Sequence, residues 1–386
     1  MRPIPYSRQS ISEDDIAAVV SVLRSDFLTQ GPVLQAFEQA FASSHEVPHA
    51  VAVSNATAGL HLACLALGVG PGSRVWTSPN SFVASANCAR YCGADIDFVD
   101  IDAASRNLSV QALRDKLQTA QASGRLPDVV VPVDFAGWPC DLREIRELAD
   151  TYGFRILADA SHATGARYLG RPVGSQLADA TVFSFHAVKV ITCGEGGMVT
   201  THDAALASRL QALRSHGITR DPSLFDEPAE GAWCYEQQQL GMNARLTDIQ
   251  AALGLSQLGR MPEMQARREA LARRYDRLLT PLPLILPTRL EDRMPSWHLY
   301  AVELDGTRTA VSRAQAFSRL RDAGIGVNVH YIPIHTQPYY RKLGFQRGEF
   351  PNAERYYARA LSLPLHPSMT DEQQDWVVQQ LGSILA

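Results

Sequence analysis

The chain has 386 residues, of which 46% are hydrophobic, so it can bury a sizeable core in one large domain or in two fused domains. Its 36 basic and 40 acidic residues give a net charge of −4 with no long block of like charge, which argues against binding to nucleic acid or to an anionic membrane. No apolar run approaches the roughly 20 residues of a membrane-spanning helix, and the first residues lack the apolar core of a secretion signal. We therefore expect a globular protein that acts in the cytoplasm.

The cysteines are scattered through apolar or glycine-rich surroundings, and none belongs to a CxxC pair: Cys64, Cys88, Cys92, Cys140, Cys193 and Cys234. This pattern is typical of reduced thiols rather than of disulfides or a zinc site. We expect no bound metal ion.

The first predicted elements are two helices. Apolar residues at helical spacing follow Ser12, which suits the N-cap position of a helix that ends before Phe27. The pair Gly31-Pro32 forbids continuation, and a second helix is predicted from about residue 33 to residue 43.

A β-type run over residues 49–54 leads directly into small and hydroxylated residues and then into an apolar helix over 60–67. Such a strand-to-helix turn leaves backbone N–H groups free at the helix N-terminus, where a phosphate group binds well. Asn55 and Thr57 suit either helix capping or contact with an anion, and the residues alone leave both interpretations open.

Strands and helices then alternate along the chain. Strands are predicted over 74–77, 95–99, 129–133 and 154–158, and helices over 82–92 and 141–152. Asp141 and Glu144 are placed as a capping pair for the second of these helices. The alternation is typical of an open α/β domain with a mainly parallel sheet, in which ligands bind at the carboxyl ends of the strands.

Asp159 follows the predicted strand 154–158 and so falls at a carboxyl end, three residues before His162. A buried carboxylate needs a partner there, and the protonated ring nitrogen of a ligand would serve. Loop amides or an arginine would satisfy this carboxylate equally well. Taken alone, His162 is more often a packed or loop histidine than a catalytic one.

Residues 181–201 are predicted as a strand, a glycine-rich turn and a second strand, and they present a single amine, Lys189. The flanking Val188, Val190 and Ile191 leave this amine poorly solvated, which lowers the pKa of an ammonium group and makes it nucleophilic near neutral pH. Schiff-base chemistry with an aldehyde cofactor requires such an amine. The ordinary alternative is a solvated lysine in a turn between core strands.

The rest of the chain is predicted to be mostly helical and then mixed. We expect a helix over 206–214, a polar, mobile loop over 222–239, a long helical region from 243 to 279, and a boundary or hinge at the prolines of 280–287. Beyond it we expect strands over 298–304 and 326–329, a helix over 312–323, a loop over 330–340, and helices after Asn352 and Thr370. We assign residues 1–250 to a large α/β domain with an N-terminal arm, and residues 251–386 to a small C-terminal α+β domain.

Together these residues supply the parts that chemistry with pyridoxal 5′-phosphate needs. The parts are an amine for a Schiff base, a carboxylate for the pyridinium nitrogen, an aromatic side chain over the ring and an anion site for the phosphate.

Their order along the chain resembles the DegT/StrS-type sugar-nucleotide aminotransferases. The resemblance covers nearly the whole chain and is carried by Asp159 to His162, Ser184 to Lys189, the run GEGG from Gly194, and Gly241 to Arg245. Softer loop similarities, among them DASHATGA from Asp159 and VHYIPIH from Val329, resemble the UDP-4-amino-4,6-dideoxy-N-acetyl-β-L-altrosamine transaminases of the pseudaminic acid pathway. The resemblance implies a fold type I, aspartate-aminotransferase-like enzyme that uses pyridoxal 5′-phosphate.

The resemblance also implies roles for single residues. Lys189 would form the Schiff base and carry the proton between the substrate carbon and the cofactor, and Asp159 would keep the pyridinium nitrogen protonated. His162 would lie near the 3′-oxygen, and Phe82 would stack on the ring. The phosphate would be held by Ala56, Thr57, Ser184 and, from a second subunit, Asn243, which makes a homodimer with shared active sites part of the mechanism.

The substrates implied are L-glutamate and the C4 keto group of a UDP-2-acetamido-2,6-dideoxyhexos-4-ulose. The sugar nucleotide would contact Tyr6, Asp26, Phe27, Leu28, Thr29, His330, Tyr331, Ile332 and Pro333, some of them across the dimer interface. Alternatives are another UDP- or dTDP-linked keto-deoxysugar, a deoxysugar dehydratase of the same fold, and a non-catalytic regulator that binds the cofactor. Lys189 argues against the dehydratase, which resembles this family but carries a histidine at that position.

One residue departs from the pattern of the family. Family members commonly have proline after the lysine, whereas this chain has Val190. The residue before a proline is confined to extended conformations, so Val190 relaxes the backbone of Lys189 without changing the chemistry of its amine.

Overall fold

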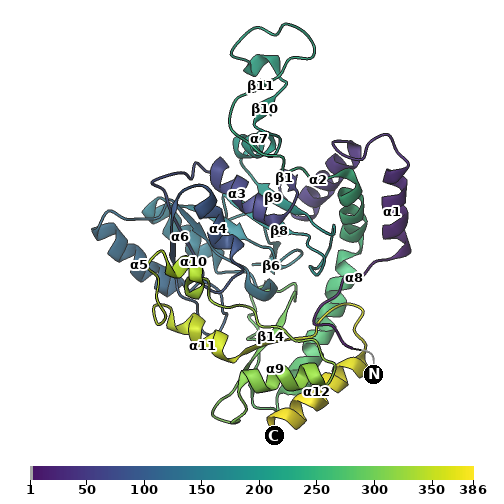
Figure 1. The fold of residues 1–386 in the computed structure, drawn as a ribbon, viewed down its shortest axis with the longest axis vertical. Helices are drawn as coiled ribbons and strands as arrows, with labels where there is room; N and C mark the ends of the chain where they lie inside the picture. Colours follow the sequence, from purple (N-terminus) through teal and green to yellow (C-terminus); the bar gives the residue numbers. More distant parts are fainter. Residues whose placement is uncertain (1–2) are drawn as a thin grey trace.

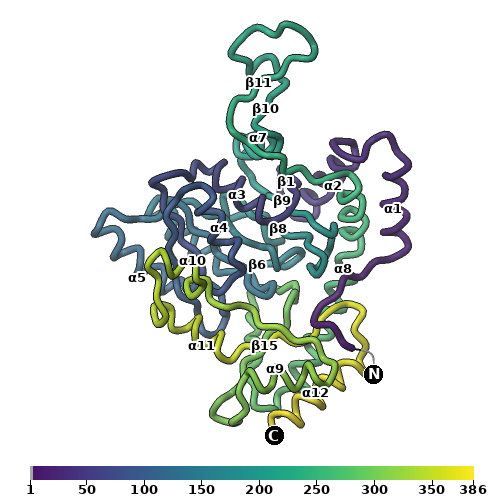
Figure 2. The backbone as a smooth tube through the Cα atoms, viewed as in Figure 1, coloured from purple at the N-terminus to yellow at the C-terminus, as the bar shows by residue number. Residues whose placement is uncertain are grey.

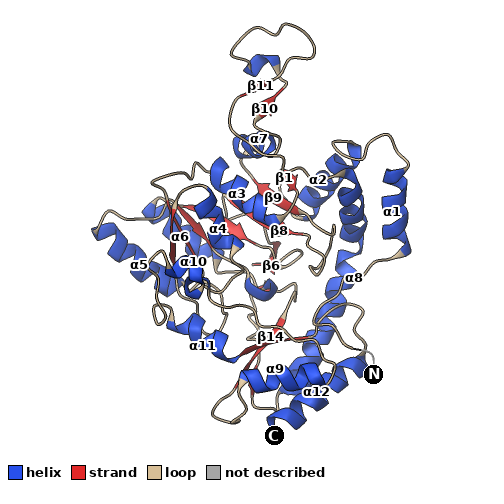
Figure 3. Ribbon diagram, viewed as in Figure 1, coloured by secondary structure: helices blue, strands red, loops and turns tan. Residues whose placement is uncertain are grey.

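The computed structural model describes residues 3–386, and within them a seven-stranded sheet forms the centre of the large part of the molecule (Figures 1 and 3). The strands lie in the order β1-β9-β8-β5-β4-β2-β3. They are β1 (His49–Val53), β2 (Arg74–Thr77), β3 (Asp95–Phe98), β4 (Val129–Val131), β5 (Arg155–Asp159), β8 (Ala180–Ser184) and β9 (Gly197–Thr201). Pairing is parallel from β3 through β2, β4 and β5 to β8, whereas β9 is antiparallel to β8 and β1. The predicted α/β fold with a mainly parallel sheet is confirmed.

Helices cover both faces of this sheet, because its strands bury side chains alternately on each side. In β1, Val51 and Val53 belong to one apolar cluster, and Ala50 and Ala52 belong to another. The helices of the large part that pack in the first cluster include α3 (Ala56–Ala66), α4 (Ala84–Tyr91) and α7 (Ala204–Leu213). On the opposite face lie α2 (Pro32–Ser44), α5 (Val110–Ala122), α6 (Leu142–Tyr152) and α8 (Asp248–Leu279).

Side-chain caps set the starts of several helices. Ser12 caps α1 (Glu13–Leu23) and shares a capping box with Asp15, as its place in the sequence predicted. The helix predicted over 60–67 begins earlier, because the Asn55 side chain accepts a 2.8 Å hydrogen bond from the Ala58 amide and starts α3 at residue 56. No element was predicted at α5, which Ser109 caps in the same way.

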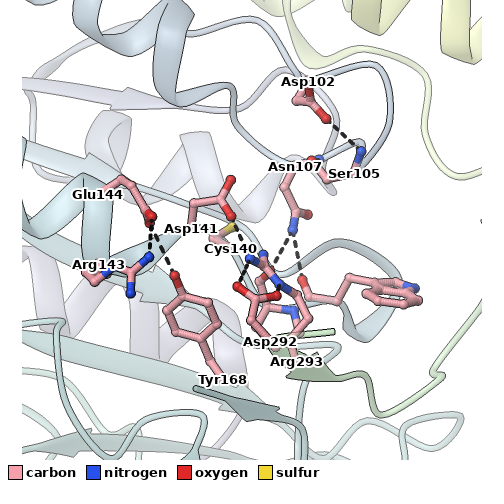
Figure 4. A network of polar contacts seen from close by, with 12 residues as sticks. Asp102, Ser105, Asn107, Cys140, Asp141, Arg143, Glu144, Tyr168, Asp292 and Arg293 are labelled. Carbon is pink, nitrogen blue, oxygen red and sulfur yellow. Dashed lines mark hydrogen bonds and ion pairs between the residues drawn. The ribbon is translucent and has the colours of Figure 1, made fainter. Parts of the chain in front are cut away.

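The capping pair predicted for α6 is wrong. Asp141 stands at the N-cap, but its carboxylate accepts a 2.7 Å hydrogen bond from Arg293, and Glu144 pairs with Arg143 instead (Figure 4). Arg293 also donates to the Pro139 carbonyl at 2.7 Å. The guanidinium therefore fastens the segment around residue 293 to the start of α6.

The small part contains a three-stranded sheet in the order β12-β14-β15. Its strands are β12 (Leu284–Ile285), β14 (Tyr300–Leu304) and β15 (Ala360–Leu363), and its helices are α9 (Arg313–Asp322), α10 (Pro338–Arg341), α11 (Pro351–Arg359) and α12 (Asp371–Leu385). The strand predicted over 326–329 is wrong, since this segment makes an isolated bridge from Asn328 to Ser362 rather than a ladder.

The boundary expected after residue 250 falls inside α8, one helix of 32 residues (Figure 1). This helix packs against α1 and α2 in the large part and against α12 in the small part. One apolar cluster also includes residues of both parts, such as Val182 and Val302. The division into two domains stays a prediction, although α8 does end where the prolines of 280–287 begin.

A hairpin projects from the large part beyond α7 (Figure 2). In it β10 (Ile218–Thr219) pairs antiparallel with β11 (Glu236–Gln237), so the polar loop predicted over 222–239 is partly built into a hairpin. The remaining short strands form a sheet in the order β13-β6-β7, with bounds Arg293–Met294, Arg167–Tyr168 and Arg171–Pro172. Single 3₁₀ turns lie at Phe135–Gly137, Pro222–Leu224 and Ile334–Thr336.

Candidate active site

A cavity of about 800 Å³ opens at the carboxyl ends of β4, β5 and β8, beside the first turn of α3. This is the edge at which ligands bind in open α/β sheets. The lining includes these residues predicted for the site: Tyr6, Ala56, Thr57, Phe82, Asp159, His162, Ser184, Lys189, His330 and Tyr331. They come from segments far apart in the sequence, so the fold brings them together.

Lys189 lies in the turn that follows β8. Its backbone amide donates to the His186 carbonyl at 2.9 Å, and the next two residues, Val190 and Ile191, are buried in the apolar cluster beneath the sheet. Burial lowers the pKa of the Lys189 amine to about 8, although the negative charge of Asp159 opposes this shift. A large fraction of this amine is therefore unprotonated and nucleophilic at mildly alkaline pH.

Asp159 is the last residue of β5 and is 4% exposed. Its Oδ2 accepts a 2.6 Å hydrogen bond from the Ser85 hydroxyl, and its Oδ1 accepts one of 3.1 Å from the Ser161 amide. Ser85 is held in turn by a 2.7 Å contact with Ser81. No ion pair with Asp159 forms within residues 3–386, so this buried carboxylate still lacks a cationic partner apart from what a ligand can bring.

His162 is neutral, and its tautomer is fixed by its neighbours. Burial, together with the nearby positive charge of Lys189, lowers its pKa well below the usual value. The Ala136 amide donates to Nδ1 at 3.2 Å, so the ring proton lies on Nε2, which donates to the Tyr331 hydroxyl at 3.0 Å.

The first turn of α3 is the natural place for an anion. The Asn55 side chain already caps the Ala58 amide, while the amides of Ala56 and Thr57, as first-turn groups, have no intrahelical partner and line the cavity. The backbone of Gly197 comes so close that a Cβ atom there would lie 2.8 Å from the Ala56 nitrogen. Asn55 is therefore a helix cap, as one of the two interpretations expected, and binding of an anion by the next two amides stays a prediction.

Aromatic side chains surround the mouth of the cavity. Phe82, which is 59% exposed, precedes α4, and its ring centroid lies 6.4 Å from that of Tyr331. Tyr6, from the N-terminal arm, lies 5.8 Å from the ring of His330, whose Nδ1 is 2.8 Å from the Ser362 hydroxyl. These rings offer flat apolar faces to a bound molecule.

Other predicted residues lie away from the lining of this cavity: Asp26, Phe27, Leu28, Thr29, Asn243, Ile332 and Pro333. The Leu28 carbonyl accepts from the Asp248 amide at 3.0 Å, Thr29 bridges to Thr247, and Asn243 bridges to Ser215. Leu28 and Thr29 therefore lie near the start of α8 and Asn243 lies near the end of α7, whereas Ile332 and Pro333 directly follow the lining residue Tyr331.

Several cavity residues were missed by the sequence analysis, chief among them His298, whose Nε2 lies 3.5 Å from Lys189 Nζ. Ser81, Ser85 and Asn328 also lie in or directly behind the lining. Ser85 sits on the helix predicted over 82–92, so the rule that a buried carboxylate needs donors could have drawn attention to it. The sequence around His298 contains no motif that distinguishes this residue from the others of the strand predicted there.

Neither a metal site nor a membrane span is found in the part of the chain that the structure describes. Residues 3–386 contain no cluster of three or more histidine, cysteine, aspartate or glutamate side chains that could hold a metal ion. None of the helices in that range is both long enough and apolar enough to cross a bilayer.

Comparison with known sequences points to one family over almost the whole chain. The sequence profile of the DegT/DnrJ/EryC1/StrS aminotransferase family matches residues 9–382. The spore coat polysaccharide biosynthesis protein SpsC of Bacillus subtilis (strain 168) is 40% identical over 385 residues, which cover 99% of this chain and 97% of SpsC.

Solved structures of similar proteins agree with this match. Helicobacter pylori PseC, an aminotransferase involved in the biosynthesis of pseudoaminic acid, has a TM-score of 0.90 and 31% identity, and the match covers 100% of this chain and 99% of PseC. Spr1654 from Streptococcus pneumoniae has been solved in a PLP-form, with a TM-score of 0.88 and 30% identity over 99% of this chain and 98% of that protein.

Proposed function

The chain belongs to the DegT/DnrJ/EryC1/StrS aminotransferase family and uses pyridoxal phosphate, and from this premise we propose its substrates and the roles of its residues. We infer that it moves an amino group from L-glutamate to the C4 keto group of a UDP-2-acetamido-2,6-dideoxyhexos-4-ulose. The proposal rests on one observation: the same cavity is lined by Lys189, by Asp159 and by the residues of the first turn of α3.

The residues of this cavity fit pyridoxal phosphate. The amine of Lys189 has a lowered pKa, Asp159 is a buried carboxylate without an ion-pair partner among the described residues, and the amides of Ala56 and Thr57 suit a phosphate. When bound, the cofactor supplies a ring that accepts electrons from the substrate carbon.

We assign the chemical work to two side chains. Lys189 would hold the cofactor through Nζ and, when that amine is free, would carry the proton between the substrate carbon and the cofactor, which its lowered pKa favours near neutral pH. Asp159, oriented by Ser85 and by the Ser161 amide, keeps a proton on the pyridine nitrogen by placing a negative charge beside it.

The remaining residues of the proposed cofactor site hold and orient the cofactor. Thr57, Ala56 and Ser184 surround the place proposed for the phosphate, and Phe82 offers the aromatic face at the cavity mouth. His162, with its proton on Nε2 and its partner Tyr331, stays neutral, so it can orient a ring oxygen without drawing the proton from Lys189.

The choice of sugar rests on similarity to PseC and on the loops around the cavity. PseC takes part in the biosynthesis of pseudoaminic acid, and it matches this chain from end to end. Tyr6, His330 and Tyr331 line the cavity and are proposed to contact the sugar nucleotide. The similarity to SpsC, a spore coat polysaccharide biosynthesis protein, supports a sugar substrate but does not indicate which sugar it is.

We further propose a homodimer with shared active sites. Asn243, Ile332, Pro333 and residues 26–29 lie away from the cavity of their own chain, which suits contacts with the site of a second copy. Asn243 would then complete the phosphate site. Co-expression of an Asn243→Ala chain with a Lys189→Ala chain tests this, because a shared site predicts activity that differs from the sum of the two separate variants.

The dehydratase alternative carries little support, because Lys189 stands where such an enzyme would carry a histidine. A regulator without turnover would bind the cofactor but fail to convert it to its amine form when glutamate is added.

The test of the proposal is product formation from a panel of keto-sugars. Purified protein would be mixed with L-glutamate and with UDP- and dTDP-linked keto-deoxysugars, and the position and stereochemistry of the new amine would be read by NMR. We expect amination at C4 of the UDP-linked 2-acetamido sugar. Conversion of only a dTDP-linked sugar would contradict the proposed substrate but would still agree with an amino-transfer reaction.

A further inference from the structure

His298 brings a second nitrogen to the amine of Lys189. Its ring lies in the cavity wall just before β14, is 3% exposed, and has its Nε2 3.5 Å from Lys189 Nζ. The ring centroid also lies 4.4 Å from that of His162. His298 is thus in contact with the reactive amine, from a segment more than a hundred residues further along the chain.

The backbone around His298 is tightly held. The Ser296 hydroxyl donates to the His162 carbonyl at 2.5 Å, and the Ser296 amide donates to the Gly137 carbonyl at 3.0 Å. Arg268 donates to the Trp297 carbonyl at 3.1 Å. Because both preceding residues are fastened, the imidazole has little freedom to move away from Lys189.

The ring of His298 is neutral. Burial lowers its pKa well below the usual value, and the nearby positive charges of Lys189 and Arg268 act in the same direction. Its other nitrogen, Nδ1, is buried and has no hydrogen-bond partner within residues 3–386. A buried polar atom without a hydrogen-bond partner is unfavourable for folding. A histidine at this position is therefore better explained by the contact of its Nε2 with Lys189 than by a contribution to stability.

An ammonium group has three donors and no acceptor, so it can meet only an imidazole nitrogen that carries no proton. In a neutral ring with its proton on Nδ1, Nε2 is such an acceptor. The geometry points to His298 as a positioning residue: we propose that its Nε2 accepts a hydrogen bond from Lys189 Nζ whenever that amine is not joined to the cofactor. The inference rests on the proposed role of Lys189.

This contact has two consequences for the free amine. It gives Nζ a neutral hydrogen-bond acceptor, and this acceptor competes with the negatively charged Asp159 for the position of the amine. It also stabilises the protonated form, since a hydrogen bond to the charged form of a group favours that form. His162 and His330 also face this region, and both have pKa values lowered by burial, so they remain neutral over the pH range of interest.

The pH dependence of labelling at Lys189 tests the inference without using enzyme activity. The chain has three lysines, so each falls on its own peptide: Lys116, Lys189 and Lys342. The full chain without cofactor would be treated briefly with acetic anhydride across a pH series, and acetylation of each lysine would be measured by mass spectrometry. Lys342, which is exposed, is the internal reference.

Two variants remove the proposed acceptor in different ways. His298→Phe keeps a ring of similar size, and His298→Asn keeps polarity but is too short to reach Nζ. We expect either variant to shift the labelling midpoint of Lys189 downward by about one pH unit, the order of effect of a hydrogen bond to a charged group. His298→Gln can place an amide oxygen near the position of Nε2, so its midpoint should stay close to that of the wild type.

His45→Phe is the matched control. His45 is also fully buried, also carries an unpartnered ring nitrogen within the described residues, and lies against Phe41 in α2 rather than in the cavity. It should leave the Lys189 midpoint unchanged. An unmoved or raised midpoint in the folded His298 variants, or an equal shift in His45→Phe, would overturn the inference. Loss of amino transfer in the wild type would instead count against the proposed function.

Discussion

The hydroxyl of Ser85 donates a 2.6 Å hydrogen bond to Oδ2 of Asp159, and so joins the helix α4 to the last residue of β5. Two structural elements that are distant in sequence thereby fix the orientation of one carboxylate.

Ser85→Ala should destabilise the protein without cofactor. A hydrogen bond to a charged buried group contributes about 2 kcal/mol, so we expect the free energy of unfolding to fall by about that amount in urea titrations. Ser208→Ala, which removes an exposed hydroxyl bonded within α7, should change stability by less than about 0.5 kcal/mol. Equal effects of the two variants would show that Asp159 does not depend on Ser85.

Lys189→Ala should abolish the visible absorbance band of a lysine-bound cofactor and lower amino transfer by at least about 100-fold, because the proton carrier is lost. Borohydride reduction of the wild-type enzyme should leave the cofactor attached to the peptide that contains Lys189. Lys342→Ala is the control and should keep both the band and the activity. Finding the reduced cofactor on the peptide of Lys116 or Lys342 would contradict the assignment.

The lowered pKa of Lys189 should make stability depend on pH. The amine titrates near pH 8 in the folded chain and near 10.5 when unfolded, so between these values the unfolded chain binds more protons and stability rises with pH. Below pH 8, Lys189→Met should therefore be more stable than the wild type, by on the order of 2 kcal/mol after allowance for partial exposure. The difference should shrink between pH 8 and pH 10.5 in urea titrations of the cofactor-free proteins. A constant difference across this range would refute the pKa shift.

Gly197→Ala should disturb the first turn of α3. The added methyl would lie 2.8 Å from the Ala56 nitrogen and from the Asn55 carbonyl carbon, which are backbone atoms that cannot rotate away. Overpacking of this kind costs about 1–3 kcal/mol, and it should also weaken cofactor binding, as measured by fluorescence titration. Gly259→Ala, in the interior of α8 with no atom within 4 Å, should instead stabilise the protein by up to about 1 kcal/mol. Unchanged cofactor affinity in Gly197→Ala would argue against the proposed phosphate site.

The parts of the site that the sequence predicted are those that depend on local order. Asp159 ends a strand, and Lys189 is followed by two apolar residues, Val190 and Ile191, that are buried in the fold, so the residues next to each in the sequence were enough to predict its setting. The strand-to-helix turn at Asn55 is local in the same way. The mainly parallel sheet follows from alternation of elements, which is also visible along the chain.

Long-range partners account for what the sequence analysis missed or assigned wrongly. Asp141 has the sequence pattern of a helix cap, yet its carboxylate accepts a hydrogen bond from Arg293, which lies 152 positions away in the sequence. Ser85 reaches the site only because α4 packs on the sheet with this residue facing the end of β5, and His298 reaches it because the segment before β14 is hydrogen-bonded to the large part. Residues 326–329 have the composition of a strand, but Asn328 and Val329 line the cavity, and Asn328 makes a single bridge.

The continuity of α8 limits how this molecule can open and close. At 1.5 Å per residue its 32 residues form a rod about 48 Å long, which packs against α1 and α2 in one part and against α12 in the other. Pro262 removes one hydrogen bond within the rod, so any bending of α8 concentrates at that position. The large and small parts are therefore tied together along this helix, and movement between them requires α8 to bend or to change its packing.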